Sequence, residues 1–301
     1  MNVTQKGKYG SVRTSLTHVY NKGQWPNEKL NKLTYTVSGD IKWNKFTADA
    51  GVTYNKRFYP NMGGTGYGGS GYLYNLLIWS GTEFDIRDYK NYWLKEDELS
   101  NWMDRSYYEN PYFIANEVTS ASDYDVVNAF ANASYEITPW LKAVLRSGVD
   151  VSSEKTEYKT PVGSTAGWGS KKGYYGIGRN NNFSINNDLL LMAEKKWGDF
   201  NLDGFLGGTI YYLRDDAVSA STQGGLVVPG YYSLKASVDP ASVSKSYSTK
   251  QVNSLYGKVS ASWKSILFLD VTGRNDWSST LPKETRSYFY PSVAGSVVLS
   301  E

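Results

Sequence analysis

Apolar and polar residues alternate with a period of two over most of this chain. Between Leu33 and Trp43 the odd positions are mostly apolar and the even positions polar, and from Phe46 to Asn55 the alternation resumes. Such alternation predicts β-strands with one apolar and one polar face, and the two residues between the runs predict a tight hairpin turn.

The same hairpin unit returns three more times. Further strand pairs are predicted at 125–137 with 140–152, 182–194 with 199–212, and 252–263 with 266–275. A weaker strand at 9–20 opens the chain and another at 287–300 closes it, giving about ten strands in all. Long connections rich in Gly, Tyr, Ser or Asn separate the hairpins at 58–123, 154–181 and 213–250. Short turns at one end and long loops at the other are typical of an outer-membrane barrel.

The placement of charges separates a barrel from a soluble sandwich. The more apolar faces of the predicted strands carry no charge, whereas the opposite faces carry Asp40, Lys42, Asp49, Glu136, Lys142, Arg146, Asp150, Asp188, Glu194, Asp203, Lys258, Asp270 and Arg274. A Lys or Arg facing lipid at mid-depth costs about 2–4 kcal/mol, whereas a water-filled lumen accepts it. A soluble sandwich also alternates, so this observation alone leaves both architectures open.

Aromatic residues favour the barrel. The short turns are bracketed by Trp43, Phe46, Trp140, Trp197, Phe200 and Trp263. Rings at strand ends fit the aromatic girdle at a membrane interface. The apolar faces also hold many small residues, such as Ala131 and Gly204, which pack poorly in a sandwich core but are compatible with lipid. The sequence therefore predicts an all-β fold, an antiparallel transmembrane β-barrel segment with short periplasmic turns and long extracellular loops.

Composition removes several other classes. The 301 residues include no cysteine and one histidine, His18, and their net charge is +3. This argues against disulfides, thiolate metal sites, Ser–His catalysis and nucleic-acid binding, and no metal or cofactor is expected. No apolar stretch is long enough for a transmembrane helix, and the first ten residues lack the apolar core of a signal peptide. The "GTGYGG" segment at 64–69 lacks the strand and helix of a dinucleotide site and is interpreted as loop.

The segment "GRNDWSST", 273–280, lies where a predicted strand ends. Continuing the alternation puts Arg274 and Asp276 on the inner face, where they can pair, and Trp277 on the outer face at the rim. On the returning strand Phe289 is expected to face outward and its two tyrosine neighbours inward. Pro291 cannot donate to the sheet, so a bulge or bend is expected there.

The sequence "TGRNDWSSTLP" followed by "RSYFYPSVAGSVVLSE", residues 272–301, resembles the signature of SusC/RagA-type TonB-dependent outer-membrane transporters of Bacteroidetes. The other hairpins agree with this family in style without recognisable motifs. The motif residues, to which a structural role is assigned, are Gly273, Arg274, Asn275, Asp276, Trp277, Ser278, Tyr288, Phe289, Tyr290 and Pro291.

The resemblance implies a barrel of about 22 strands, a plug domain in its lumen and a TonB box that binds the TonB complex. It also implies a SusD-like surface lipoprotein that delivers oligosaccharide or oligopeptide cargo, and no enzymatic activity. No plug, TonB box or terminal aromatic strand is found in 1–301. The expectation is a partial receptor barrel domain in the bacterial outer membrane that takes part in nutrient uptake.

The predicted loops hold the candidates for cargo contact. Two short helices are expected there, within 91–110 and within 71–79. Flat aromatic rings can stack on sugar faces or peptide groups. The candidates are Trp79, Tyr92, Trp93, Trp168, Tyr174, Tyr175, Tyr231 and Tyr232.

Three alternatives remain open on the sequence alone. One is a TonB-dependent receptor for siderophores or cobalamin. Another is a small outer-membrane barrel enzyme, because ten strands could close by themselves. The third is a surface-displayed β protein that binds glycan.

Overall fold

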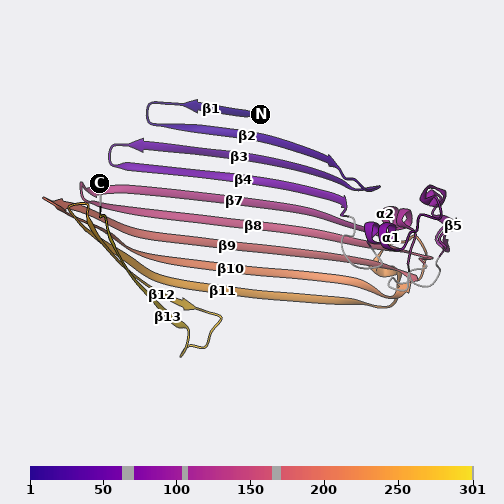
Figure 1. Cartoon of the computed structure of the whole chain (residues 1–301). Coiled ribbons are helices and arrows are strands. Elements are labelled where there is room, and N and C mark those ends of the chain that lie inside the picture. The colour runs from indigo at the N-terminus through magenta and orange to yellow at the C-terminus, as the bar shows by residue number, and fades with distance from the viewer. Residues whose placement is uncertain (63–70, 104–107, 165–170, 300–301) are drawn as a thin grey trace.

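The computed structural model describes residues 1–62, 71–103, 108–164 and 171–299, and its main feature is one antiparallel sheet of eleven strands (Figure 1). The strands are β1 (Asn2–Lys6), β2 (Gly10–Lys22), β3 (Lys29–Trp43), β4 (Phe46–Asn61), β7 (Thr119–Thr138), β8 (Leu141–Val162), β9 (Lys172–Trp197), β10 (Phe200–Leu226), β11 (Ser237–Trp263), β12 (Leu267–Ser278) and β13 (Ser287–Val297). Every strand pairs with its neighbours in chain order. Within the described ranges, no helix is long and apolar enough to cross a membrane.

The predicted all-β antiparallel fold and its hairpins are confirmed, with one more strand than expected. β1 was missed because five residues carry too little alternation. The turns at the Trp-rich end are tight: Asn44 has φ 53°, Gly198 has φ 54° and Lys264 has φ 50°. The first two lie in two-residue turns whose twist matches that of the strands, whereas Lys264 lies in a three-residue turn between Trp263 and Leu267.

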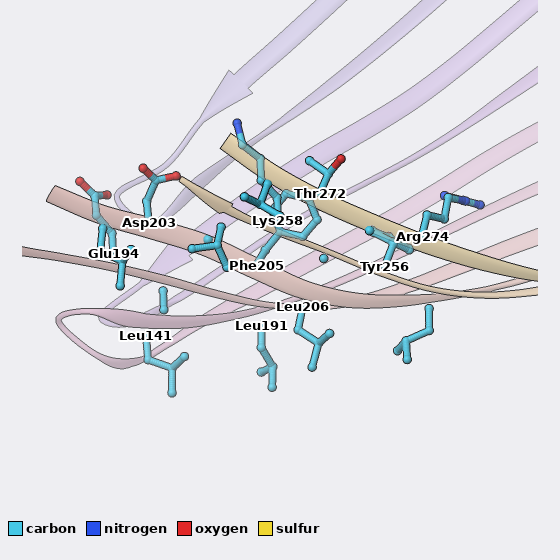
Figure 2. Close-up of a pocket in the computed structure, with 18 of the residues that line it drawn as sticks. Leu141, Leu191, Glu194, Asp203, Phe205, Leu206, Tyr256, Lys258, Thr272 and Arg274 are labelled. Carbon is cyan, nitrogen blue, oxygen red and sulfur yellow. The ribbon is translucent and has the colours of Figure 1, made fainter. Parts of the chain in front are cut away.

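The register confirms that the two faces differ. On β8 and β9, Leu145 lies opposite Leu189, and the next pair is Arg146 with Asp188. Figure 2 shows Leu141, Leu191 and Leu206 on one side of the sheet and Glu194, Asp203 and Lys258 on the other. We call the leucine side the outward face and the charged side the inner face.

The loops predicted at 154–181 and 213–250 are wrong, because strands run through most of both. β8 to β11 contain 22 to 27 residues each, and a strand of this length is roughly 70–90 Å long at about 3.3 Å per residue. The outward face of β8 is mainly apolar from Leu141 to Val151, which is about 25 Å of height at a tilt near 45°. Beyond that band come outward charges, Lys155 on β8 and Arg179 on β9. We call these polar continuations the strand extensions.

Only short connections remain between the extensions, 163–171 and 227–236, whereas the long connection predicted at 58–123 is confirmed as 62–118. It contains α1 (Tyr72–Ile78), the 3₁₀ turn Ile86–Lys90, the small hairpin β5 (Trp93–Lys95) with β6 (Leu99–Ser100), and α2 (Pro111–Glu117). A second 3₁₀ turn, Leu234–Ala236, lies between β10 and β11.

The end of β12 has the predicted ion pair. Arg274 Nε donates to Asp276 Oδ1 at 2.8 Å, and Arg274 Nη2 donates to Ser254 Oγ of β11 at 2.9 Å. The guanidinium also lies 5.2 Å from the Tyr256 ring centroid. Arg274 therefore ties β12 to β11 on the inner face.

Of the bulge or bend expected at Pro291, the bulge is wrong. The register between β12 and β13 is continuous, with Gly273 opposite Pro291 and Asn275 opposite Phe289. Pro291 therefore takes its place in the ladder opposite Gly273 without shifting the register.

Spin labels test both the faces and the height of the apolar band. One outward and one inner position can be labelled on each of three strands: Val52 with Asp49, Leu145 with Arg146, and Val259 with Lys258. The outward labels should report lipid and the inner labels water. A label at Tyr247, outward on the β11 extension, should report water, because the strand has left the bilayer there. Lipid contact at Tyr247 would contradict the assignment of the extensions.

Arg274→Ala should lower the thermal stability of the sheet, by about 1 kcal/mol, because a partly exposed ion pair with one further hydrogen bond contributes little more. Thermal unfolding followed by loss of β-structure measures this. Arg179→Ala, which removes an exposed outward arginine, is the matched control. A large loss of cargo affinity with unchanged stability would instead give Arg274 a binding role.

Candidate functional site: the loop cap and the strand extensions

The connection between β4 and β7 forms a small folded unit, which we call the loop cap (described residues 71–103 and 108–118). It lies at the end of the sheet opposite the tight turns (Figure 1). α2 starts as its sequence dictates: the Asn110 side chain accepts from the backbone N–H of Tyr112, and Pro111 occupies the first helical turn. The start of α2 is therefore specified by the residues of the cap itself.

The cap has its own apolar core. Its buried side chains are Trp102, Phe113, Ile114 and Ala115. The Trp93 ring meets Phe113 edge-on at a centroid distance of 4.8 Å, and Tyr89 meets Trp102 at 5.0 Å. Edge-to-face pairs of this kind add to the stability that burial supplies.

A buried carboxylate joins three parts of the cap region. Glu109 is 1% exposed and accepts from Ser100 Oγ of β6 at 3.1 Å and from Ser164 Oγ, after β8, at 3.0 Å. It also accepts from the backbone N–H of Asn110 at 2.8 Å. A buried charge is tolerated only with such hydrogen bonds, so Glu109 fixes the positions of its donors.

The cap is fastened to the ends of the strands. The carbonyl of Ala115 accepts from Asn61 Nδ2 of β4 at 3.0 Å and from Asn27 Nδ2, in the β2–β3 turn, at 3.2 Å. The backbone N–H of Ser100 donates to the carbonyl of Gly163 at 3.1 Å. The cap therefore contacts the tips of β2 to β4 and of β8.

Within the cap, the helix expected at 91–110 is wrong and the one at 71–79 is confirmed as α1. Trp93–Lys95 and Leu99–Ser100 form a hairpin instead, which turns at Asp97 with φ 55°. α2 was not predicted. Residues 104–107 and the "GTGYGG" segment lie outside the described residues.

The eight cargo-contact candidates do not form one site. Trp79 stacks on Tyr108 at 3.8 Å. Tyr92 and Trp93 pack on Phe113 inside the cap. Tyr175 and Tyr232 lie 6.4 Å apart, and Tyr231 beside them is 54% exposed. Tyr174 is the neighbour of Tyr175 on β9 and so points to the other face, and Trp168 lies outside the described residues.

Glu117, at the end of α2, links part of this aromatic set. It accepts from Trp93 Nε1 at 3.4 Å. Burial, followed by a hydrogen bond to Glu117, raises the pKa of Tyr92 to about 12. Burial, followed by the charges of Glu117 and Asp97, also raises the pKa of Tyr232. Both tyrosines therefore stay neutral well above ordinary pH and act as hydrogen-bonding aromatic surface.

The inner face of the strand extensions holds a polar cavity that sequence reasoning missed. Its volume is about 250 Å³, and its lining includes Glu154, Thr156, Asn180, Ser219, Ser244 and Ser246. Glu154 Oε1 accepts from Ser122 Oγ at 2.7 Å. The sequence did not identify these residues because the segments that carry them were predicted to be loops. Hydroxyls and amides so arranged can hydrogen-bond a polar ligand, and in the described part of the chain no cluster of metal-ligating side chains accompanies them.

The raised pKa of Tyr92 predicts that the cap loosens in alkali. Its neutral form is favoured in the folded state, so its contribution is complete below pH ~10, the unfolded value, and is lost as pH rises towards 12. Limited proteolysis between pH 9 and 12 should cut the cap before the strands. Tyr92→Phe should shift this onset to higher pH, whereas the exposed Tyr231→Phe should not. Equal onsets for both variants would refute the assignment.

No known family model matches this chain, and no curated protein matches it in sequence. Among solved structures, the RagAB peptide transporter superposes with a TM-score of 0.74 at 16% identity, covering 98% of this chain and 33% of that one. BauA, the ferric preacinetobactin receptor from Acinetobacter baumannii, gives 0.61 at 11% identity and covers 100% and 43%. The pyoverdine outer membrane receptor FpvA from Pseudomonas aeruginosa gives 0.58 at 12% identity and covers 99% and 42%.

These structures are of transporters and receptors, not enzymes, and this chain spans about a third of the length of the RagAB chain. At such low identity the likeness concerns the fold. RagAB also shares its name with the family that residues 272–301 resemble, so that resemblance is confirmed at the level of the fold. The chain has the fold of the barrel wall of TonB-dependent outer-membrane transporters.

Proposed function

We propose that this chain forms part of the wall and the outer surface of a TonB-dependent transporter that imports oligopeptides or oligosaccharides together with a SusD-like surface lipoprotein. The observation that carries the proposal is the sheet that continues past its apolar band, with a polar inner face, and ends under a folded cap. RagAB, a peptide transporter with similar strands, supports the peptide branch of the proposal.

The inner face of the extensions suits an uncharged polar cargo. Serine, threonine and asparagine side chains dominate the cavity between β8 and β11, and Glu154 is its one inward charge within the described residues. Peptide groups and sugar hydroxyls both donate and accept hydrogen bonds, as these side chains do. The similarity to BauA and FpvA supports the alternative that the cargo is a siderophore. Uptake assays with a siderophore and with oligopeptides or oligosaccharides distinguish the two classes of cargo.

The cap supplies a surface for a protein partner. Large apolar side chains are exposed on α1, on β5 and in the β10–β11 turn: Leu77, Ile78, Trp79, Leu94, Val227 and Val228. The elements that carry these side chains lie at the far end of the sheet, beyond the apolar band, so lipid is not expected to cover them (Figure 1). Exposed apolar groups that gather in water are typical of protein–protein contact. We assign this surface to the lipoprotein.

The proposal also includes strands outside the eleven described. β1 and β13 are the edges of the described sheet and do not pair with each other. A lipid-exposed edge leaves backbone groups without hydrogen bonds, so spanning sheets close into barrels. In the proposed transporter other strands complete the wall, and the plug and the TonB contact belong to other segments.

The partner surface can be tested with point variants in the full-length protein. Leu77→Ser with Ile78→Ser should reduce co-purification of the lipoprotein at least about tenfold, or ~1.4 kcal/mol, because both side chains are well exposed on α1. Val243→Ser is the matched control, since Val243 is 69% exposed on β11 outside the cap. An equal loss in the control would point to a general effect of removing exposed apolar groups.

A second design removes the cap. The backbone N–H of Met62 donates to the carbonyl of Ser120 at 2.7 Å, so the ends of β4 and β7 are already joined. Replacing 64–117 by a short Gly-Ser turn should leave a barrel that inserts but neither retains its partner nor imports cargo. Growth on the cargo at the wild-type rate would contradict the proposal.

A further inference from the structure

The outward face has a groove near the tight turns, distinct from the cap and from the polar cavity. Its volume is about 970 Å³, within the roughly 300–1,000 Å³ of small-molecule sites, and it crosses β8 to β13. Figure 2 shows the leucines of this face, Leu141, Leu191 and Leu206, standing away from the charged residues of the inner face. A flat lipid-facing wall does not require such a hollow.

Small residues form the floor of the groove. Ala193 of β9 lies opposite Gly204 of β10, and Gly257 of β11 lies opposite Gly273 of β12. Larger outward side chains stand along both sides, namely Leu206, Leu255 and Phe289 on one side and Leu202, Val259 and Val271 on the other. A Cβ placed on Gly273 would lie 3.4 Å from Phe289 Cε2, so this ring covers Gly273 and ends the groove. The result is a diagonal apolar channel across four strands.

A single cation stands at the other end of the channel. Lys195 lines the groove beside Ala193, and its Nζ lies 5.4 Å from the Trp197 ring centroid and 6.0 Å from that of Trp140. Along the apolar band of β3 to β13, as far as these strands are described, no other outward side chain is charged. No carboxylate of the described residues forms an ion pair with Lys195, so its charge is free for a ligand.

We propose that this groove binds an anionic glycerophospholipid of the leaflet at the tight-turn end. The lipid phosphate pairs with Lys195 between the two tryptophans, and one acyl chain lies along the floor from Ala193 to Gly273. The argument for lipid is complementarity: one cation at the level of the aromatic girdle, followed by an apolar channel that runs towards the bilayer centre. The proposal needs the outer-membrane fold but not the proposed cargo.

Native mass spectrometry of the intact protein, purified in mild detergent with phosphatidylglycerol or phosphatidylcholine, tests this site. The wild type should retain phosphatidylglycerol preferentially. Lys195→Met should reduce this preference at least fivefold. Gly273→Leu should reduce retention of both lipids, because the new side chain fills the channel while its Cβ meets only ordinary contacts.

Matched controls exist for both variants. Lys264→Met removes a lysine 5.0 Å from the Trp263 ring at the same end of the sheet but outside the groove. Gly208→Leu adds the same side chain on the outward face, also outside the groove. Both should retain lipid as the wild type does, and heat stability shows that each variant is folded. Equal lipid retention in all variants would overturn the proposal. A dimer of this chain in the wild-type spectrum that disappears in Gly273→Leu would also overturn the proposal, because the groove would then be a dimer interface.

Discussion

In a lipid bilayer every backbone N–H and C=O must find its hydrogen-bond partner inside the protein, and this constraint sets the form of the sheet. The ladder between β10 and β11 pairs residue for residue from Phe200 with Trp263 to Ser221 with Ser242. Register shifts do occur, but at strand ends: after Ser221, between Glu136 and Thr138, and between Lys29 and Asn31. Irregular pairing is confined to places where water or the cap can satisfy a backbone group.

Beyond the bilayer the same hydrogen-bonded ladder continues in contact with water instead of lipid. Lipid no longer excludes charge from the outward face, so Lys56 of β4 can form an ion pair with Asp125 of β7 at 3.0 Å just past Tyr54. The inner face stays polar, and the strands lengthen into extensions on which the cap is fastened. One continuous sheet therefore provides a spanning wall, a polar surface above it and a support for the cap.

The sequence predicted the part of each strand that lies in the apolar band. Alternation located the spanning halves of the hairpins because a one-residue slip would bury charge in the bilayer. The same reasoning failed at 213–250, where Arg214, Asp215 and Asp216 put charge on both faces and the period of two disappears. It also failed in the cap, where the near-helical spacing of Trp93, Leu94 and Leu99 belongs to the hairpin of β5 and β6, with Trp93 packed on Phe113.

The candidate site was less predictable than the fold because it is built from distant residues. Tyr175 meets Tyr232, and Glu117 bonds Trp93, only after the extensions and the cap are in place. Aromatic composition marked the right regions, but it could not show which rings are packed inside the cap. The polar cavity could not be predicted, because a serine-rich sequence does not distinguish a strand extension from a loop.

In the proposed transporter, the lengths of the extensions determine how far a cargo at the cap lies from the bilayer. From Arg214, where outward charge begins on β10, to Leu226 is about 40 Å of strand, or roughly 28 Å of height at a tilt near 45°. A cargo held at the cap would therefore lie well above the bilayer surface. To reach the lumen it would have to pass along the inner face of the extensions, where Asn180, Ser219 and Ser244 lie. A row of neutral hydrogen-bonding groups such as these holds a polar chain weakly at many points, which favours passage over retention.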